Sequence, residues 1–229
     1  SSDETRFLTG TDEHGLKIQK AAEKLSISPL ELCNKNSEIF RNLTKTLNLS
    51  NDDFIRTTED RHKDGATYLW NLLFEKGDIY LDEYTGWYSV NDETFYNEKD
   101  LIKQNDGSFR TITGGPVEWI KEESYFFKLS KYQDKLLNYY SENHQFILPE
   151  SKRNEVINFV KSGLKDLSVS RASFNWGIKV PDNSDHIMYV WLDALTCYPN
   201  SVNYLNNEQG ELSSFWSNTT HIVGKDILR

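Results

Sequence analysis

RFLTGTDEHGLKIQKAAEKL, residues 6–25, is the stretch that decides the fold class of this 229-residue chain. RFLT (6–9) predicts a short strand, and GTDEHG (10–15) predicts a glycine-bounded loop. A helix is expected from Leu16 to about Leu25. A strand, a glycine-bounded loop and a helix in this order favour an α/β fold.

The following segments repeat the pattern. Ser28-Pro29-Leu30-Glu31 predicts a helix start, because Ser28 can cap, Pro29 suits the first turn and Glu31 completes a capping box. Apolar residues then recur at helical spacing: Leu32, Ile39, Phe40, Leu43 and Leu47. DFIRT (53–57) predicts a second strand. Thr58 is expected to cap a helix that ends near Gly77.

The middle of the chain has a different texture. IYLDEYTGWYSVNDETFY (79–96) is rich in Tyr, Trp and turn residues, and further turn signals lie at 105–107 and 114–116. We therefore expect three parts: residues 1–77 and 129–229 from one α/β domain, and a small β-rich insertion at 78–128.

Regular patterns return after the insertion. Helices are predicted around 132–140 and 156–160, the latter closing near Gly163, and strands at 167–170, 187–192 and 221–223. A helix is expected after Gly224-Lys225-Asp226, and the chain stops at Arg229 just as it should begin. We therefore expect this chain to be a piece of a longer protein.

Composition limits the class of protein. With 37% hydrophobic residues the chain can bury a core, and with 27% charged residues and no long apolar run it predicts no membrane span. Two isolated cysteines, Cys33 and Cys197, suit a reducing compartment and support neither a disulfide framework nor a cysteine-rich metal site. The net charge of −9 means that any RNA contact must be local or lie on another part of the protein. Residues 1–7 resemble neither a signal nor a transit peptide.

Three polar segments follow predicted strands, where ligands bind in open α/β sheets. They are GTDEHG (10–15), LDAL (192–195) after a strand ending near Trp191, and GKD (224–226). GTDEHG lacks the spacing of a dinucleotide fingerprint, GKD lacks the glycine-rich run of a P-loop, and both are also ordinary turn chemistry. His14 and His62 are too far apart in sequence to indicate a metal pair. The residues alone therefore predict a nucleotide- or small-molecule-binding α/β domain.

Nine blocks in order resemble the methionyl-tRNA synthetases and cover nearly the whole chain. They are FLTGTDEHGLKIQ (7–19), DFIRTTEDRH (53–62), WYSVNDETFY (87–96), SYFFKLSKY (124–132), RNEVINFV (153–160), DLSVSR (166–171), WGIKVP (176–181), YVWLDAL (189–195) and HIVGKDIL (221–228).

The resemblance implies a Rossmann-like class I synthetase catalytic domain. Such a ligase joins methionine to ATP, with magnesium, as methionyl-adenylate and transfers the methionyl group to tRNA(Met). The HIGH motif that precedes the first block in the family and the KMSKS loop that follows the last are missing. This piece alone is therefore expected to be inactive.

The resemblance also implies roles for individual residues. Asp12 matches the carboxylate that holds the α-ammonium of methionine, and Arg171 matches an arginine that acts on the carboxylate and the developing adenylate. Gly224 and Asp226 match the ATP-binding strand end. The wall of the methionine side-chain pocket is matched by Trp191, Ala194, Leu195 and Tyr198; some family members carry proline in place of Leu195.

The insertion departs from the relatives that carry a zinc knuckle here. Ser89 and Asp92 stand at the positions of the first cysteine pair, and no cysteine occurs in 78–128. Structural zinc needs four N or S ligands, so no zinc and no other metal is expected. Aromatic packing is expected to hold the insertion instead, through Tyr84, Trp87, Tyr88, Phe95, Tyr96 and Trp119.

Three alternatives remain open on the sequence. The first is a class I synthetase for leucine, valine or isoleucine, which usually carries a larger insertion. The second is a non-catalytic synthetase-like module that binds tRNA or a partner, and the third is an unrelated nucleotide-binding Rossmann protein. A cytoplasmic location is expected, with the mitochondrial matrix as the alternative, and the sequence leaves the oligomeric state open.

Overall fold

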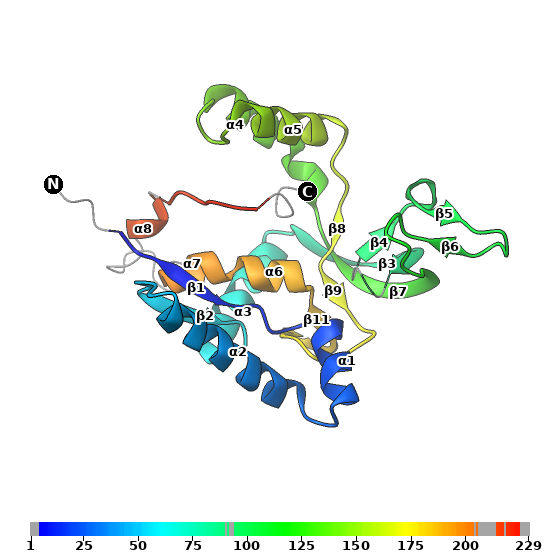
Figure 1. Cartoon of the computed structure of the whole chain (residues 1–229). Helices are drawn as coiled ribbons and strands as arrows, with labels where there is room; N and C mark the ends of the chain where they lie inside the picture. The colour runs from blue at the N-terminus through cyan, green and yellow to red at the C-terminus, as the bar shows by residue number, and fades with distance from the viewer. Residues whose placement is uncertain are drawn as a thin grey trace.

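Two parallel strands and their helices form the first part of the molecule (Figure 1). The computed structural model describes residues 5–89, 91, 94–203, 205, 214–217 and 219–224, without the side chains of Tyr84 and Glu122. Strand β1 (Leu8–Thr11) pairs in parallel with β2 (Asp53–Arg56). The helices α1 (Leu16–Lys24) and α2 (Pro29–Thr46) connect them, and α3 (Asp60–Glu75) follows β2. The mixed α/β class predicted from the sequence is confirmed.

Local sequence explains where these helices begin. The hydroxyl oxygen of Ser28 accepts a hydrogen bond from the backbone N–H of Glu31 at 3.1 Å, as predicted, while the Glu31 carboxylate accepts one from Lys35 instead of closing the capping box. Gly15, at φ 108°, adopts the left-handed conformation that leads from the loop into α1. The residues with apolar helical spacing do form helix α2, as predicted. Some of these apolar side chains are not buried, however: Ile39 is 66% exposed and Leu47 is 58% exposed.

An antiparallel sheet fills the middle of the chain. Strand β3 (Ile79–Ser89) pairs with β7 (Glu118–Phe127) over ten residues, and the sheet has the order β4-β3-β7-β8. Strands β4 (Thr94–Tyr96) and β8 (Leu167–Ser168) lie on its two sides. A short 3₁₀ turn, η1 (Glu98–Asp100), precedes a small hairpin of β5 (Ile102–Lys103) and β6 (Phe109–Arg110).

A helical hairpin follows the sheet and projects from the rest of the molecule (Figure 1). It consists of the 3₁₀ turn η2 (Leu129–Tyr132), α4 (Gln133–Glu142) and α5 (Glu150–Lys161). Both helices lie where their apolar spacing predicts them. Asp78, at the start of β3, anchors η2 by accepting hydrogen bonds from Lys131 Nζ at 2.5 Å and from Tyr132 Oη at 2.6 Å.

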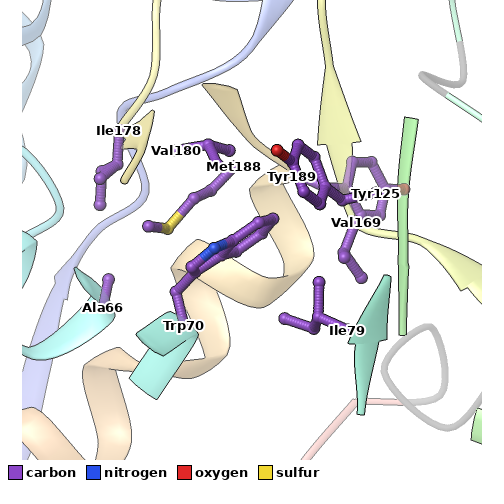
Figure 2. Packing of buried hydrophobic residues seen from close by; sticks show 9 residues of the cluster. All are labelled: Ala66, Trp70, Ile79, Tyr125, Val169, Ile178, Val180, Met188 and Tyr189. Carbon is purple, nitrogen blue, oxygen red and sulfur yellow. The ribbon is translucent and has the colours of Figure 1, made fainter. Parts of the chain in front are cut away.

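The last part of the chain contributes most of the residues of the hydrophobic core. Strands β9 (Ser170–Arg171), β10 (Lys179–Val180) and β11 (Asn183–Met188) form a sheet of order β10-β11-β9. Three short helices follow: α6 (Val190–Leu195), α7 (Cys197–Ser201) and α8 (Ser214–Ser217). The core surrounds Trp70 and joins α3, strands β3 and β7 and the chain from Val169 to Tyr189 (Figure 2). Its members are Ala66, Trp70, Ile79, Tyr125, Val169, Ile178, Val180, Met188 and Tyr189.

Besides the capping box, four sequence predictions are corrected. The first strand begins at Leu8 instead of Arg6, because the ladder starts where Leu8 meets Asp53. Thr58 does not cap α3, whose N-cap is Glu59; the Thr58 hydroxyl donates to Glu13 Oε2 at 2.5 Å.

The other two concern strands. The strand predicted at 187–192 ends at Met188, because the chain turns into α6 with the N–H of Asp193 donating to the carbonyl of Tyr189. Residues 221–223 form no strand: a strand needs a neighbouring strand, and none of the described residues pairs with them. Ile222 is 96% exposed.

No helix among the described residues is long and apolar enough to cross a membrane.

Candidate functional site

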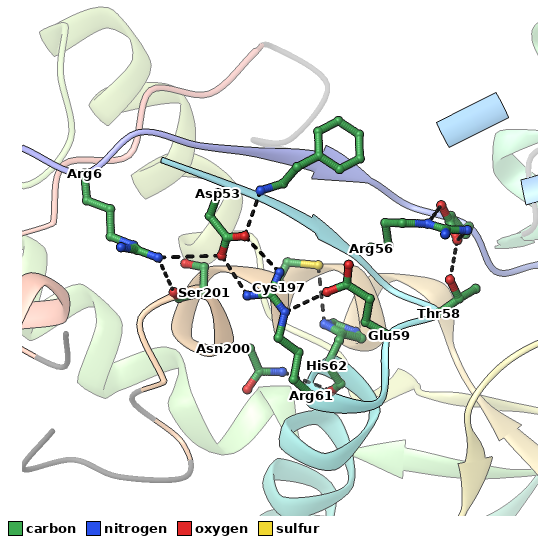
Figure 3. Close-up of polar contacts among 12 residues, drawn as sticks. Arg6, Asp53, Arg56, Thr58, Glu59, Arg61, His62, Cys197, Asn200 and Ser201 are labelled. Atoms are coloured by element: carbon green, nitrogen blue, oxygen red, sulfur yellow. Dashed lines mark hydrogen bonds and ion pairs between the residues drawn. The ribbon is translucent and has the colours of Figure 1, made fainter. Parts of the chain in front are cut away.

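The loop after β1 is held by a buried carboxylate. Glu13 is 3% exposed, and its two oxygens accept hydrogen bonds from Arg56 Nε at 2.7 Å and Arg56 Nη2 at 2.9 Å. The hydroxyls of Thr11 and Thr58 donate to the same carboxylate at 2.7 and 2.5 Å. Arg56 and Thr58 lie beside each other at the end of β2 (Figure 3). This network ties the loop that carries Asp12 to the end of the second strand.

A second contact holds the loop from the other side. Trp176 Nε1 donates to the backbone carbonyl of Glu13 at 2.6 Å, and the Trp176 ring meets the His14 ring edge-on, with centroids 5.5 Å apart. Cys33, on α2, donates to the same carbonyl at 3.3 Å. The backbone on either side of Asp12 is therefore fixed by β1 on one side and by these contacts on the other.

Helices α6 and α7 present two different faces. Trp191, Ala194, Leu195 and Tyr198 stand at positions i, i+3, i+4 and i+7, so they share one face of the helical turn. Asp193 falls on the opposite face. It is 0% exposed, whereas Trp191 and Tyr198 are each 40% exposed.

The exposed face lines a cavity of about 510 Å³ together with the loop after β1. All five residues predicted to bind methionine line this one cavity: Asp12, Trp191, Ala194, Leu195 and Tyr198. His14, Lys17, Ile18, Tyr189 and Val190 complete the wall. A cavity of this size suits a small molecule, with apolar and aromatic walls on one side and a carboxylate on the other.

Arg171 lies next to this cavity but does not line it. It is 3% exposed, with its guanidinium carbon 4.3 Å from the ring centroid of Tyr189 and 5.2 Å from that of Phe95. Its Nη1 donates to Ser168 Oγ at 2.8 Å and to the carbonyl of Ser170 at 2.6 Å. Within the described part of the chain no carboxylate forms an ion pair with it, and its buried Nε has no hydrogen-bond partner. Tyr189 lines both the cavity and the recess that holds Arg171.

The predicted ATP-binding pair is not brought to the cavity by the described residues. Gly224 lies in an exposed irregular segment with open space around its Cα, and Asp226 lies outside the described residues. The same segment borders a separate cavity of about 580 Å³. Tyr198 lines both cavities, and its ring meets that of His221 with centroids 5.2 Å apart.

Sequence reasoning missed the contacts of Asp193. Its carboxylate meets His14 Nδ1 at 2.5 Å and His62 Nε2 at 2.6 Å. Burial acts to raise the pKa of Asp193, but the hydrogen bonds from the two histidines outweigh it and hold the pKa below its usual range. One signal could have found this site: a charged residue inside the apolar run YVWLDAL needs a buried partner. Among the residues that the structure describes, no group of three or more His, Cys, Asp or Glu is placed to hold a metal ion.

Comparisons with known proteins identify the family. The family model described as tRNA synthetases class I (M) matches residues 1–105 and 107–229. The chain therefore belongs to the class I tRNA synthetases of this methionine group.

Individual relatives agree with this family assignment. The chain is 55% identical over 226 residues to the methionine–tRNA ligase of Rhizobium meliloti (strain 1021), covering 99% of this chain and 44% of that protein. It is 56% identical over 223 residues to the methionine–tRNA ligase of Rickettsia conorii, covering 97% of this chain and 43% of that protein. The chain thus spans less than half the length of these relatives.

A solved structure agrees as well. The crystal structure of Mycobacterium tuberculosis methionyl-tRNA synthetase bound by methionyl-adenylate superposes with a TM-score of 0.92 at 48% identity. The superposition covers 99% of this chain and 45% of that one.

Proposed function

We propose that this chain is the methionine-binding part of a methionine–tRNA ligase, which joins methionine to ATP as methionyl-adenylate and transfers the methionyl group to tRNA(Met). The observation that carries the proposal is the cavity of about 510 Å³, which brings Asp12 and the aromatic wall of α6 and α7 together. Relatives over 50% identical carry this activity in their names.

The cavity has the chemistry that methionine needs. The Asp12 carboxylate accepts hydrogen bonds and attracts the α-ammonium, since an ionised acceptor forms the stronger bond. Trp191 and Tyr198 pack against the thioether, whose sulfur interacts favourably with aromatic rings by roughly 0.3–1.5 kcal/mol. Ala194 and Leu195 close the apolar wall between them.

Arg171 serves the carboxyl end of the substrate. The Arg171 guanidinium is buried against aromatic rings and has no ion-pair partner among the described residues, so it can bind an anion. Support comes from Tyr189, which lines both the recess that holds Arg171 and the cavity proposed to bind methionine. The role of Arg171 is to stabilise the charge that develops on the carboxylate and the adenylate.

The proposed function also includes ATP binding by the chain on a Rossmann-like domain. ATP, with magnesium, contacts Gly224 and Asp226 in the complete enzyme, on a Rossmann-like sheet of which β1 and β2 are the described parallel pair. Residues 1–77 and 129–229 form that domain, and 78–128 form the insertion.

The insertion holds no zinc in this proposal. Support comes from the absence of cysteine in 78–128 and from aromatic packing: the Trp87 ring lies 4.7 Å from Phe109 and 5.2 Å from Trp119. Elemental analysis of protein purified without chelators tests this, and stoichiometric zinc contradicts it. The proposed location is the cytoplasm, which fits two free cysteines and is tested by cell fractionation.

Methionine-dependent ATP–pyrophosphate exchange tests the function. The full-length enzyme is expected to catalyse this exchange. This 229-residue chain alone is expected not to catalyse it. Asp12→Ala should raise the methionine dissociation constant roughly tenfold or more, because a hydrogen bond to a charged group is lost, while ATP binding stays nearly unchanged. Exchange that depends on leucine, valine or isoleucine would favour another synthetase. No exchange with any amino acid would favour a non-catalytic binding module.

A further inference from the structure

Asp193 is a buried charge that the proposed chemistry does not use. It is fully buried in α6, two residues after Trp191 and directly before Ala194, which both line the proposed methionine cavity. A buried carboxylate is unfavourable unless it is well paired, so its partners are part of the design of the site.

Its two partners come from two other elements of the fold. His14 belongs to the loop that carries Asp12 and itself lines the cavity, while His62 lies in the first turns of α3 and is 0% exposed. The carboxylate meets one ring nitrogen of each, at 2.5 and 2.6 Å. Since the pKa of Asp193 is lowered, the carboxylate is ionised and both facing nitrogens donate N–H.

His62 is in turn fixed to α7. Its Nδ1 lies 3.5 Å from Cys197 Sγ, and its backbone carbonyl accepts a hydrogen bond from Asn200 Nδ2 at 3.0 Å (Figure 3). Asp193, Cys197 and Asn200 stand at positions i, i+4 and i+7, so they form the inner face of α6 and α7. The outer face of the same helices is the wall of the cavity.

We propose that Asp193, held by His14 and His62, is a positioning residue that sets the distance between Asp12 and the aromatic wall of Trp191 and Tyr198. This clasp, made of Asp193, His14 and His62, therefore determines which side-chain length the pocket accepts. The inference rests on the proposed function and deepens it. In the proposed function Asp12 binds one end of the substrate and Trp191 contacts the other, and the clasp directly joins the elements that carry them.

Asp193→Asn is the sharpest perturbation because it keeps the shape of the side chain. The amide oxygen can accept from only one imidazole, and its NH₂ group then faces the ring nitrogen of the other, which can bond to it only by changing tautomer. In the full-length enzyme, active-site-titrated exchange kinetics would be measured with methionine and with ethionine, which is one CH₂ longer. We expect the KM for methionine to rise about tenfold or more. The preference for methionine over ethionine should fall, and the KM for ATP should stay unchanged.

Asp78→Asn is the matched control. Asp78 also exposes little surface and accepts two short hydrogen bonds, but it anchors η2 and does not line the cavity. It should lower stability and leave the methionine constants and the selectivity at the parent values. A general loss of folded enzyme would reduce the active fraction in both variants without changing selectivity.

A second pair of variants tests the clasp if Asp193→Asn folds poorly. His62 does not line the cavity, so His62→Leu removes a donor of the clasp without touching the substrate. It should shift selectivity in the same direction, and His62→Gln, which still offers an N–H, should recover part of it. Parent-like selectivity in Asp193→Asn, or in His62→Leu, overturns the clasp. If the unmodified enzyme shows no methionine-dependent exchange, the proposed function fails and the selectivity role fails with it.

Discussion

Replacing Glu13 by Gln should destabilise the chain far more than an ordinary loss of a surface charge. Four hydrogen bonds converge on the Glu13 carboxylate, two of them from Arg56. An amide offers one acceptor oxygen where the carboxylate offered two, so at least one Arg56 N–H loses its acceptor. The hydrogen bonds with Glu13 raise the pKa of Arg56, so the guanidinium stays charged at every working pH.

The magnitude follows from burial. Removing one partner of a buried ion pair costs about 3–5 kcal/mol. The Glu13 side chain is 3% exposed and that of Arg56 is 18% exposed, so solvent can relieve only part of the loss. Arg56 also keeps its hydrogen bond to Asn34 Oδ1 at 2.8 Å. We therefore expect the lower end of that range, about 3 kcal/mol.

Urea unfolding followed by circular dichroism measures the free energy of unfolding of Glu13→Gln and of the parent. Glu31→Gln is the control. Glu31 forms an ion pair with Lys35 at 2.7 Å, but their side chains are 51% and 60% exposed. An exposed pair on a helix contributes about 0.3–0.5 kcal/mol, so the control should unfold almost at the parent midpoint. If the two variants lie within about 0.5 kcal/mol of each other, the Glu13 network does not stabilise the loop and the reasoning from burial is wrong.

Four further predictions concern other parts of the molecule. Gly65→Ala should lower stability by roughly 1–3 kcal/mol in thermal unfolding, because its Cβ would lie 1.7 Å from Asn200 Oδ1; Asn200→Ala in the same protein should recover part of the loss. Burial raises the pKa of Cys33 to about 11 and that of Cys197 to about 12, so iodoacetamide at pH 8 should alkylate both much more slowly in the native chain than in urea. The hydrogen bonds from Lys131 and Tyr132 lower the pKa of Asp78, so its contribution is present above the ordinary value of 3.8 and lost as pH falls through the lowered value. Asp78→Asn should therefore lose less stability than the parent in acid unfolding between about pH 5 and pH 2. In the full-length enzyme, Arg171→Ala should slow single-turnover adenylate formation more than it weakens methionine binding, and an unchanged rate would remove Arg171 from the chemistry.

The sequence predicted the elements whose signals are local. The capping serine at Ser28, the apolar spacing of α4 and α5 and the strand after Asn51 all depend on residues near one another in the chain, and the structure places each of them as predicted. The turn-rich texture after Gly77 likewise predicted the β-strands of the middle region, although it did not predict that β3 and β7 would pair over ten residues.

The sequence predictions are wrong where tertiary contacts determine the secondary structure. IMYVWL (187–192) is rich in residues that favour strands, so its composition predicts a single strand. The chain instead turns into α6 after Tyr189, because this places Asp193 between His14 and His62. The correct period was present: Trp191, Ala194, Leu195 and Tyr198 have helical spacing, while a strand would put Trp191 and Leu195 on the same face as Asp193. The identity of the histidine partners, 179 and 131 residues away, could not be read from local sequence.

Three consecutive residues of the loop after β1 have three different tasks. Asp12 faces the cavity, Glu13 binds the end of β2 through Arg56, and His14 binds α6 through Asp193. Because the two residues that follow Asp12 are anchored to different elements, the position of its carboxylate is set by the protein and not by the ligand. Substitutions at these positions should therefore separate three effects. We expect a change at Glu13 to act mainly on stability and a change at Asp12 to act mainly on methionine binding. A change at His14 should act on both, because His14 lines the cavity and also binds α6 through Asp193.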